Sequence, residues 1–310
     1  MLKFIASQLA PLTLLGAFVA YLYPPAFLIF KQYFLWFFAA TMFALGLVIK
    51  FKDLQDEWRY PRQIALGVLT QFTVMPVLVF MVAQYAGFSP AIAIGFIIVG
   101  AAPGAMASNV IVYLAGGAVA FSITLTTVAT ILSPLLTPAL VKLLGGAIMP
   151  VEFVPLMKTI LLTVLLPLGA GIFVQPYLGR HLQQAKQMAP GVAALAIIII
   201  CGYAVAANQS RIADMALPVM AGVIAVNLAG YALGWGLARS YGFDRLRRIT
   251  LMIEIGMQNA GMGVALALKH FPPESALPGA LFAVWCILTG AIASAWLRRQ
   301  QQKKYQPEPA

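Results

Sequence analysis

Of the nine acidic residues in this chain, only Glu254 lies inside a long apolar run, and the other eight lie in polar connections. A carboxylate at membrane depth is costly unless a cation or hydrogen-bond donors compensate it, so it indicates a functional site. The sequence places no Lys or Arg at the same depth to neutralise it. Two chemistries fit this pattern: Glu254 binds a metal cation, or it carries a proton.

Several neutral polar residues are expected at the same depth as Glu254. With a helical rise of about 1.5 Å per residue, each lies roughly 6 to 12 Å from the cytoplasmic end of its apolar run. Two of them, Ser122 and Thr126, share one helix face because they are four residues apart. Together with Glu254 itself, the set comprises Gln71, Asn109, Ser122 and Thr126.

This set supplies carboxylate, amide and hydroxyl oxygens but lacks the thiolates and imidazoles that transition metals prefer. Ser108, Gln258 and Asn259 add further polar groups next to two predicted helix breaks, where main-chain carbonyls are also released. A proton needs a single acceptor, whereas this site offers many, so the pattern favours Na⁺. A proton on Glu254 stays the alternative.

The composition indicates a membrane protein. The 310 residues are 62% hydrophobic and 9% charged, with a mean hydropathy of +0.90, which is too apolar for a soluble core. The net charge of +11 comes from basic residues between apolar runs and not from a basic patch interleaved with aromatic residues, so we expect no nucleic-acid partner. Neither the cysteines nor the histidines have metal-ligand spacing, and we expect no cofactor.

Ten apolar runs are each long enough for a membrane-spanning helix of about 20 residues. The first begins near the N-terminus and resembles a signal peptide, but no small-x-small cleavage site precedes Pro24, so we interpret it as a span. The polar residues from Arg298 onward are expected to form a disordered tail. The predicted spans are 9–30, 33–49, 63–86, 89–116, 118–141, 153–174, 188–207, 216–238, 249–268 and 277–297.

The distribution of basic residues predicts the orientation of these spans. If the N-terminus lies inside, 15 of the 20 Lys and Arg residues fall on the cytoplasmic side. Lys and Arg are enriched in cytoplasmic loops, so both termini are expected in the cytoplasm of a bacterial cell, with the chain in the inner membrane.

Interruptions at matching positions suggest that the chain has two halves. The fourth run contains residues 100–104, GAAPG, and the ninth contains residues 256–261, GMQNAG. Such matched Gly and Pro interruptions indicate broken helices around a binding site near the membrane midplane. Because each half has five spans, the second must be inverted relative to the first. The sequence therefore predicts an all-α membrane protein with two inverted five-helix repeats, typical of a secondary transporter.

The half-helices after the breaks would point their positive ends at a central cavity, which favours an anionic substrate. Met106 and other Met and aromatic residues could surround an apolar part of that substrate. A channel would need a continuous pore instead of broken helices. An intramembrane enzyme would need a nucleophile with a base, or a second acid near Glu254, so we expect no enzymatic activity.

Three stretches of the chain resemble the bile acid sodium symporter family, and the similarity to its bacterial members covers nearly the whole length. These stretches are 103–109 (PGAMASN), 133–138 (SPLLTP) and 254–259 (EIGMQN). The resemblance implies a panel domain of spans 1, 2, 6 and 7 and a core domain of spans 3–5 and 8–10. The corresponding segments are 1–60 and 147–210 for the panel, 61–146 and 211–298 for the core, and 299–310 for a cytoplasmic tail.

The resemblance also implies sodium-coupled import of an organic anion, either bile-acid-like or a small carboxylate, by alternating access. A proton-coupled carrier stays the alternative, and a monomer is the assumed state. Asn259 would face the substrate beside Met106 and Cys286, and Cys286 stands where some bacterial members have a polar residue. The implied first sodium site comprises Ser108, Asn109, Ser122, Thr126 and Glu254, and the second Gln71, Glu254, Gln258 and the main-chain oxygens of Ile255 and Met257.

Overall fold

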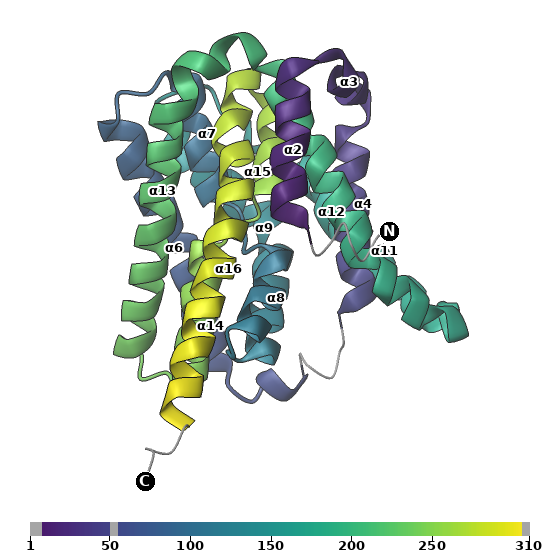
Figure 1. Cartoon of the computed structure of the whole chain (residues 1–310), viewed down its shortest axis with the longest axis vertical. Coiled ribbons are helices and arrows are strands. Elements are labelled where there is room, and N and C mark those ends of the chain that lie inside the picture. The colour runs from purple at the N-terminus through teal and green to yellow at the C-terminus, as the bar shows by residue number, and fades with distance from the viewer. Residues whose placement is uncertain (1–7, 50–54, 306–310) are drawn as a thin grey trace.

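The structure is a computed structural model that describes residues 8–49 and 55–305, and within these ranges it contains helices and no strand. Most helices run along the long axis of the molecule (Figure 1). The α-helices are α2 (Leu9–Leu22), α3 (Pro25–Leu28), α4 (Phe34–Val48), α6 (Pro61–Tyr85), α7 (Pro90–Gly100), α8 (Met106–Leu114), α9 (Val119–Gly145), α10 (Phe153–Ile160), α11 (Leu166–Val174), α12 (Leu182–Ala207), α13 (Gln209–Ser240), α14 (Arg245–Gly256), α15 (Ala260–His270) and α16 (Leu277–Tyr305).

Five helical stretches in the described residues are long and apolar enough to cross a membrane, and a bent pair near the N-terminus makes a sixth. One of the five, Phe153–Ala207, contains α10, α11 and α12 and so covers two of the predicted spans. Within it, Gly179 adopts a non-helical φ of 45°. The described residues are therefore all helical, with five or six candidate membrane spans, as expected for an all-α membrane protein.

The first predicted span, 9–30, is not one continuous helix. Helix α2 ends at Leu22, and residues Pro25–Gln32 turn away from it by 110°. Pro24 and Pro25 have no N–H to continue the helix, and a proline disfavours helical geometry at the residue before it. Tyr23 accordingly leaves the helical region, with a ψ of 75°.

The prediction that the tail is disordered from Arg298 onward is wrong for the described part of the tail. Helix α16 continues to Tyr305, because Arg, Gln and Lys favour helix and no Gly or Pro interrupts the segment before Pro307. The rest of the predicted tail, 306–310, lies outside the described residues.

Two sets of helices pack internally. Helix α12 packs against α2 and α4, and α4 packs against α11, while α13 packs against α6, α14 and α16. The crossing of α4 and α11 depends on glycine, since a Cβ on Gly46 would lie 2.2 Å from the carbonyl oxygen of Leu168. Helix α15 lies between the two sets, since it contacts α12 and α4 of the first set and α16 of the second. Helix α12 also contacts α16 directly.

Candidate functional site

The fourth and ninth apolar runs are both interrupted, and the two interruptions lie against each other. Helix α7 ends at Gly100 and α8 begins at Met106, while α14 ends at Gly256 and α15 begins at Ala260. Between them, Gly104 and Gln258 form an antiparallel bridge. The flanking peptide groups pair across the crossing, because Ala105 N–H donates to Met257 O at 2.9 Å and Asn259 N–H donates to Pro103 O at 2.8 Å. Each break thereby provides hydrogen-bond partners for backbone groups of the other break that have no partner within a helix.

Glu254 lies at this crossing, in the last turn of α14, and its side chain is buried. The hydroxyl of Ser108, on α8, donates to Glu254 Oε1 at 2.6 Å. The hydroxyl of Ser122, on α9, donates to the same oxygen. The hydroxyl of Thr126, one turn further along α9, donates to Oε2 at 3.0 Å. Three of the residues predicted from depth and motif therefore converge on the predicted carboxylate.

The cluster around Glu254 holds more acceptor oxygens than hydroxyl protons. A hydroxyl has one proton to donate, yet each of the three faces a second acceptor: Ala105 O at 2.6 Å from Ser108 Oγ, Asn109 Oδ1 at 2.8 Å from Ser122 Oγ and Ser122 O at 3.0 Å from Thr126 Oγ1. No ion pair within residues 8–49 and 55–305 involves Glu254. Its negative charge and the surplus lone pairs together suit a cation with oxygen ligands.

A second polar group lies beside Glu254. The amide of Gln71, on α6, donates to Gln258 Oε1 at 2.8 Å and lies 3.3 Å from Ala102 O. The amide of Gln258 donates to Ile255 O at 3.0 Å. A cavity of about 10 Å³ lies between Gln71 and the carboxylate, which is about the space that one water molecule needs. Its lining comprises Gly67, Val68, Gln71, Gly104, Leu125, Ala129 and Glu254. Gln258 does not line it and borders a larger cavity instead.

The three residues predicted to face a substrate line one larger cavity on the other side of the crossing. Met106, Asn259 and Cys286 border a space of about 50 Å³. Phe38, Thr41 and Met42 of α4 and Ile197 of α12 form the facing wall, and the first residues of α8 and α15 also border the space. The remaining lining residues are Ala105, Ala107, Gln258, Ala260, Gly261, Ala283 and Ile287.

Sequence reasoning missed two residues that hold the broken ends. The buried hydroxyl of Thr137, on α9, donates to Ala101 O at 2.7 Å just after α7. The buried amide of Asn227, on α13, donates to Gly256 O at 2.8 Å at the end of α14. Asn227 is an isolated amide in an apolar stretch of α13, and that signal was available in the sequence. Thr137 is one of several Ser and Thr residues of α9, and only its place in the 133–138 stretch distinguishes it.

Comparisons with known proteins found one matching family and several relatives that are named as transporters. Residues 35–215 match the Sodium Bile acid symporter family. The chain is 35% identical over 288 residues to a Bacillus subtilis (strain 168) protein named "Uncharacterized sodium-dependent transporter YocS", covering 93% of this chain and 90% of that protein. It is 32% identical over 265 residues to "Probable sodium/metabolite cotransporter BASS1, chloroplastic" of Arabidopsis thaliana, covering 85% of this chain and 66% of that protein.

Proposed function

The chain belongs to the Sodium Bile acid symporter family, and we propose that it is a sodium-coupled symporter that imports an organic anion by alternating access. The observation that carries this proposal is the cluster at the helix crossing. There, the oxygens of a buried carboxylate and of neutral groups outnumber the hydroxyl protons that face them. The names of the relatives, which describe sodium-dependent transport, favour Na⁺ over the proton-coupled alternative.

The first sodium site in this proposal is formed by Ser108, Asn109, Ser122, Thr126 and Glu254. The hydroxyl protons that now face the carboxylate would rotate away from an incoming Na⁺, so that the hydroxyl oxygens become ligands. The convergence of Ser108, Ser122 and Thr126 on one carboxylate supports this site.

The second sodium site is formed by Gln71, Glu254, Gln258 and the carbonyl oxygens of Ile255 and Met257. The 10 Å³ cavity supports the part of this site formed by Gln71 and Glu254, because it provides room for one ion next to both side chains. Glu254 would contribute to both sites, so the two ions share one compensating charge.

The substrate would bind in the cavity bordered by Met106, Asn259 and Cys286. The N-termini of α8 and α15 meet there, and their positive ends favour a carboxylate group, while the mostly apolar lining suits the rest of an organic anion. A space of about 50 Å³ holds only a few water molecules. An organic anion would therefore enter when α4 and α12 move away from α8, α15 and α16.

That motion fits a panel of segments 1–60 and 147–210 rocking against a core of segments 61–146 and 211–298. We further propose ten crossings in two inverted repeats, with both termini in the cytoplasm and the chain in the bacterial inner membrane. The repeat is supported by matched contacts: Gln71 of α6 approaches Ala102 O at the first break, and Asn227 of α13 donates to Gly256 O at the second.

Uptake into proteoliposomes tests the proposal. Labelled bile acid, 2-keto acid and hydroxy acid are supplied with an inward Na⁺ gradient or with Na⁺ replaced by K⁺. We expect saturable uptake of at least one carboxylate that requires Na⁺. Glu254→Gln is expected to abolish this uptake, whereas Glu152→Gln, at an exposed acid before α10, keeps it. Uptake driven by a pH gradient in K⁺, or sodium-dependent uptake by Glu254→Gln, would overturn the assignment.

A further inference from the structure

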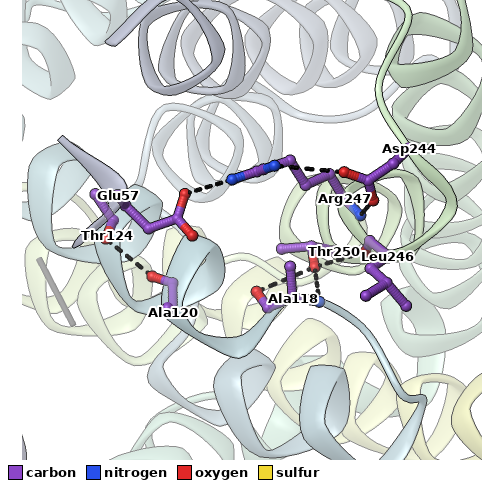
Figure 2. Close-up of polar contacts among 8 residues, drawn as sticks. All are labelled: Glu57, Ala118, Ala120, Thr124, Asp244, Leu246, Arg247 and Thr250. Carbon is purple, nitrogen blue, oxygen red and sulfur yellow. Dashed lines mark hydrogen bonds and ion pairs between the residues drawn. The ribbon is translucent and has the colours of Figure 1, made fainter. Parts of the chain in front are cut away.

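Helices α9 and α14 are joined by hydrogen bonds at their N-terminal ends, one turn before the candidate ion site. The N–H of Ala118, the residue that precedes α9, donates to Thr250 Oγ1 at 2.9 Å. The Thr250 hydroxyl in turn lies 2.9 Å from Leu246 O and 3.3 Å from Ala118 O. Figure 2 shows these contacts converging on one hydroxyl. Thr250 is fully buried.

This junction has the same spacing to the ion site on both helices. Ser122 follows Ala118 by four residues on α9, and Glu254 follows Thr250 by four residues on α14. Residues four apart lie on the same helix face, about 6 Å along the axis. The Ala118–Thr250 contact is therefore followed, one turn later, by the Ser122–Glu254 contact. Thr126, another turn along α9, reaches the other oxygen of the same carboxylate.

The hydrogen bond from Ala118 distinguishes Thr250 from an ordinary threonine in a helix. Threonine hydroxyls commonly donate to the carbonyl four residues earlier, which is a local interaction. Thr250 makes that bond to Leu246 and also accepts from a backbone group 132 residues away. The turn before α9 lies close to this hydroxyl, since a Cβ on Gly117 would lie 3.0 Å from Thr250 Oγ1.

The start of α14 is held by other contacts that do not involve Thr250. Arg247 forms an ion pair with Glu57 at 3.0 Å, and its backbone N–H is capped by Asp244 (Figure 2). The Arg247 guanidinium also lies 4.5 Å from the centre of the Tyr60 ring. Loss of the Thr250 hydroxyl would therefore leave α14 attached, and at the start of α9 the Ala118 N–H would keep only its 3.4 Å contact to Leu246 O.

We propose that Thr250 is a positioning residue, which sets the axial register of α14 against α9 and thereby the distances from Glu254 to Ser122 and Thr126. This inference rests on the proposed sodium-coupled function. Sodium affinity then depends on a hydroxyl that does not itself contact the ion.

Thr124 offers a matched control for Thr250. It is also a fully buried threonine, and its hydroxyl donates to the carbonyl four residues earlier, Ala120 O, at 2.9 Å (Figure 2). No hydrogen bond of Thr124 to α14 is found among the described residues. Replacing either threonine by valine keeps the shape and removes one local hydrogen bond. Only the change at Thr250 also removes the 2.9 Å hydrogen bond from Ala118 N–H, which leaves that N–H with its longer contact of 3.4 Å to Leu246 O.

The test measures binding of radioactive Na⁺ to the purified full-length protein, together with its thermal unfolding in K⁺. Thr250→Val is expected to raise the half-saturating Na⁺ concentration about fivefold, as expected for loss of one hydrogen bond at the site's support. Thr250→Ser restores the hydroxyl and is expected to restore binding. Thr124→Val is expected to bind Na⁺ like the wild type. Equal sodium affinities for Thr250→Val and Thr124→Val would overturn the inference.

A second variant removes the same hydrogen bond from α9. Ala118→Pro deletes the N–H that donates to Thr250 Oγ1 and, at 3.4 Å, to Leu246 O, at a residue whose φ of −80° a proline accepts. We expect it to weaken Na⁺ binding in the same direction and to add little in combination with Thr250→Val. If Thr250→Val does not fold, unchanged Na⁺ binding by Ala118→Pro overturns the inference.

The same assay separates this inference from the proposed function. Absence of Na⁺ binding to the wild type would overturn both. Na⁺ binding to the wild type that is lost in Glu254→Gln but unchanged in Thr250→Val and in Ala118→Pro would overturn only the role of Thr250.

Discussion

Gly104 and Glu254 belong to different broken helical runs, yet a Cβ atom on Gly104 would lie 2.6 Å from Glu254 Oε2. The backbone of the first break thus passes against the carboxylate of the second. A side chain at position 104 would occupy part of the cavity that Glu254, Gly104 and Gln71 line. Glycine at this position keeps that space open.

Gly104→Ala is therefore expected to weaken Na⁺ binding about tenfold or more, because an extra methyl group in a close-packed site forces the carboxylate to shift. Sodium-dependent uptake and binding of radioactive Na⁺ measure the effect. Gly236→Ala is the control, since a Cβ there has no neighbour within 4 Å. Normal Na⁺ affinity in Gly104→Ala would contradict the proposed placement of the second ion.

Gln258→Leu is expected to reduce the cooperativity of sodium activation. The substitution removes the partner of Gln71 and a donor to Ile255 O, while the hydroxyls around Glu254 remain. If two ions bind, the uptake rate should then change from a sigmoidal to a more hyperbolic function of Na⁺ concentration. Gln209→Leu changes a glutamine whose amide donates at the surface to Tyr21 O, and it should leave the curve sigmoidal. A sigmoidal curve in Gln258→Leu would argue against its role as an ion ligand.

Asn227→Leu is expected to destabilise the second break. It leaves the buried Gly256 carbonyl without the amide that donates to it. The Thr289 hydroxyl loses one acceptor and keeps Trp285 O and Cys286 O. Leaving the Gly256 carbonyl unpaired costs about 1 to 3 kcal/mol, so the thermal unfolding midpoint in K⁺ should fall. Because Gly256 is two residues from Glu254, Na⁺ should also bind more weakly. An unchanged unfolding midpoint would show that the amide is dispensable.

His270 is expected to make stability depend on pH. It lies at the end of α15, beyond the predicted span, and Thr159 Oγ1 lies 2.8 Å from its Nε2. Burial, followed by the charge of Lys269, holds the pKa of His270 below its ordinary value of 6.5, and Glu152 partly opposes this.

Since the folded-state pKa is lowered, the unfolded chain binds the proton more readily, and the free energy of unfolding should fall as the pH drops below about 6.5. Thermal unfolding measured from about pH 5 to pH 8 checks this expectation. His270→Gln should flatten the acidic part of the profile. A profile identical to that of the wild type would show that another group is responsible.

Much of the fold could be predicted because it follows from local properties. Hydropathy identified the apolar helices, and the Gly and Pro residues around Pro103 and Gly256 indicated where two of them break. The bend after Leu22 is equally local, because Pro24 and Pro25 have no N–H to continue the helix. The continuation of α16 to Tyr305 likewise follows from the helix-favouring residues after Leu297.

The sequence by itself determined the chemical types in the candidate site, namely a lone apolar-run carboxylate with amides and hydroxyls at similar depth. The tertiary structure decided which of them meet. Whether Ser122 reaches Glu254 depends on the rotation of α9 and α14 and on their relative position along the axis. Those quantities are set by packing and by contacts such as Ala118 with Thr250, between residues 132 positions apart. Periodicity within one helix carries no information about the register between two, and so the convergence had to come from the folded chain.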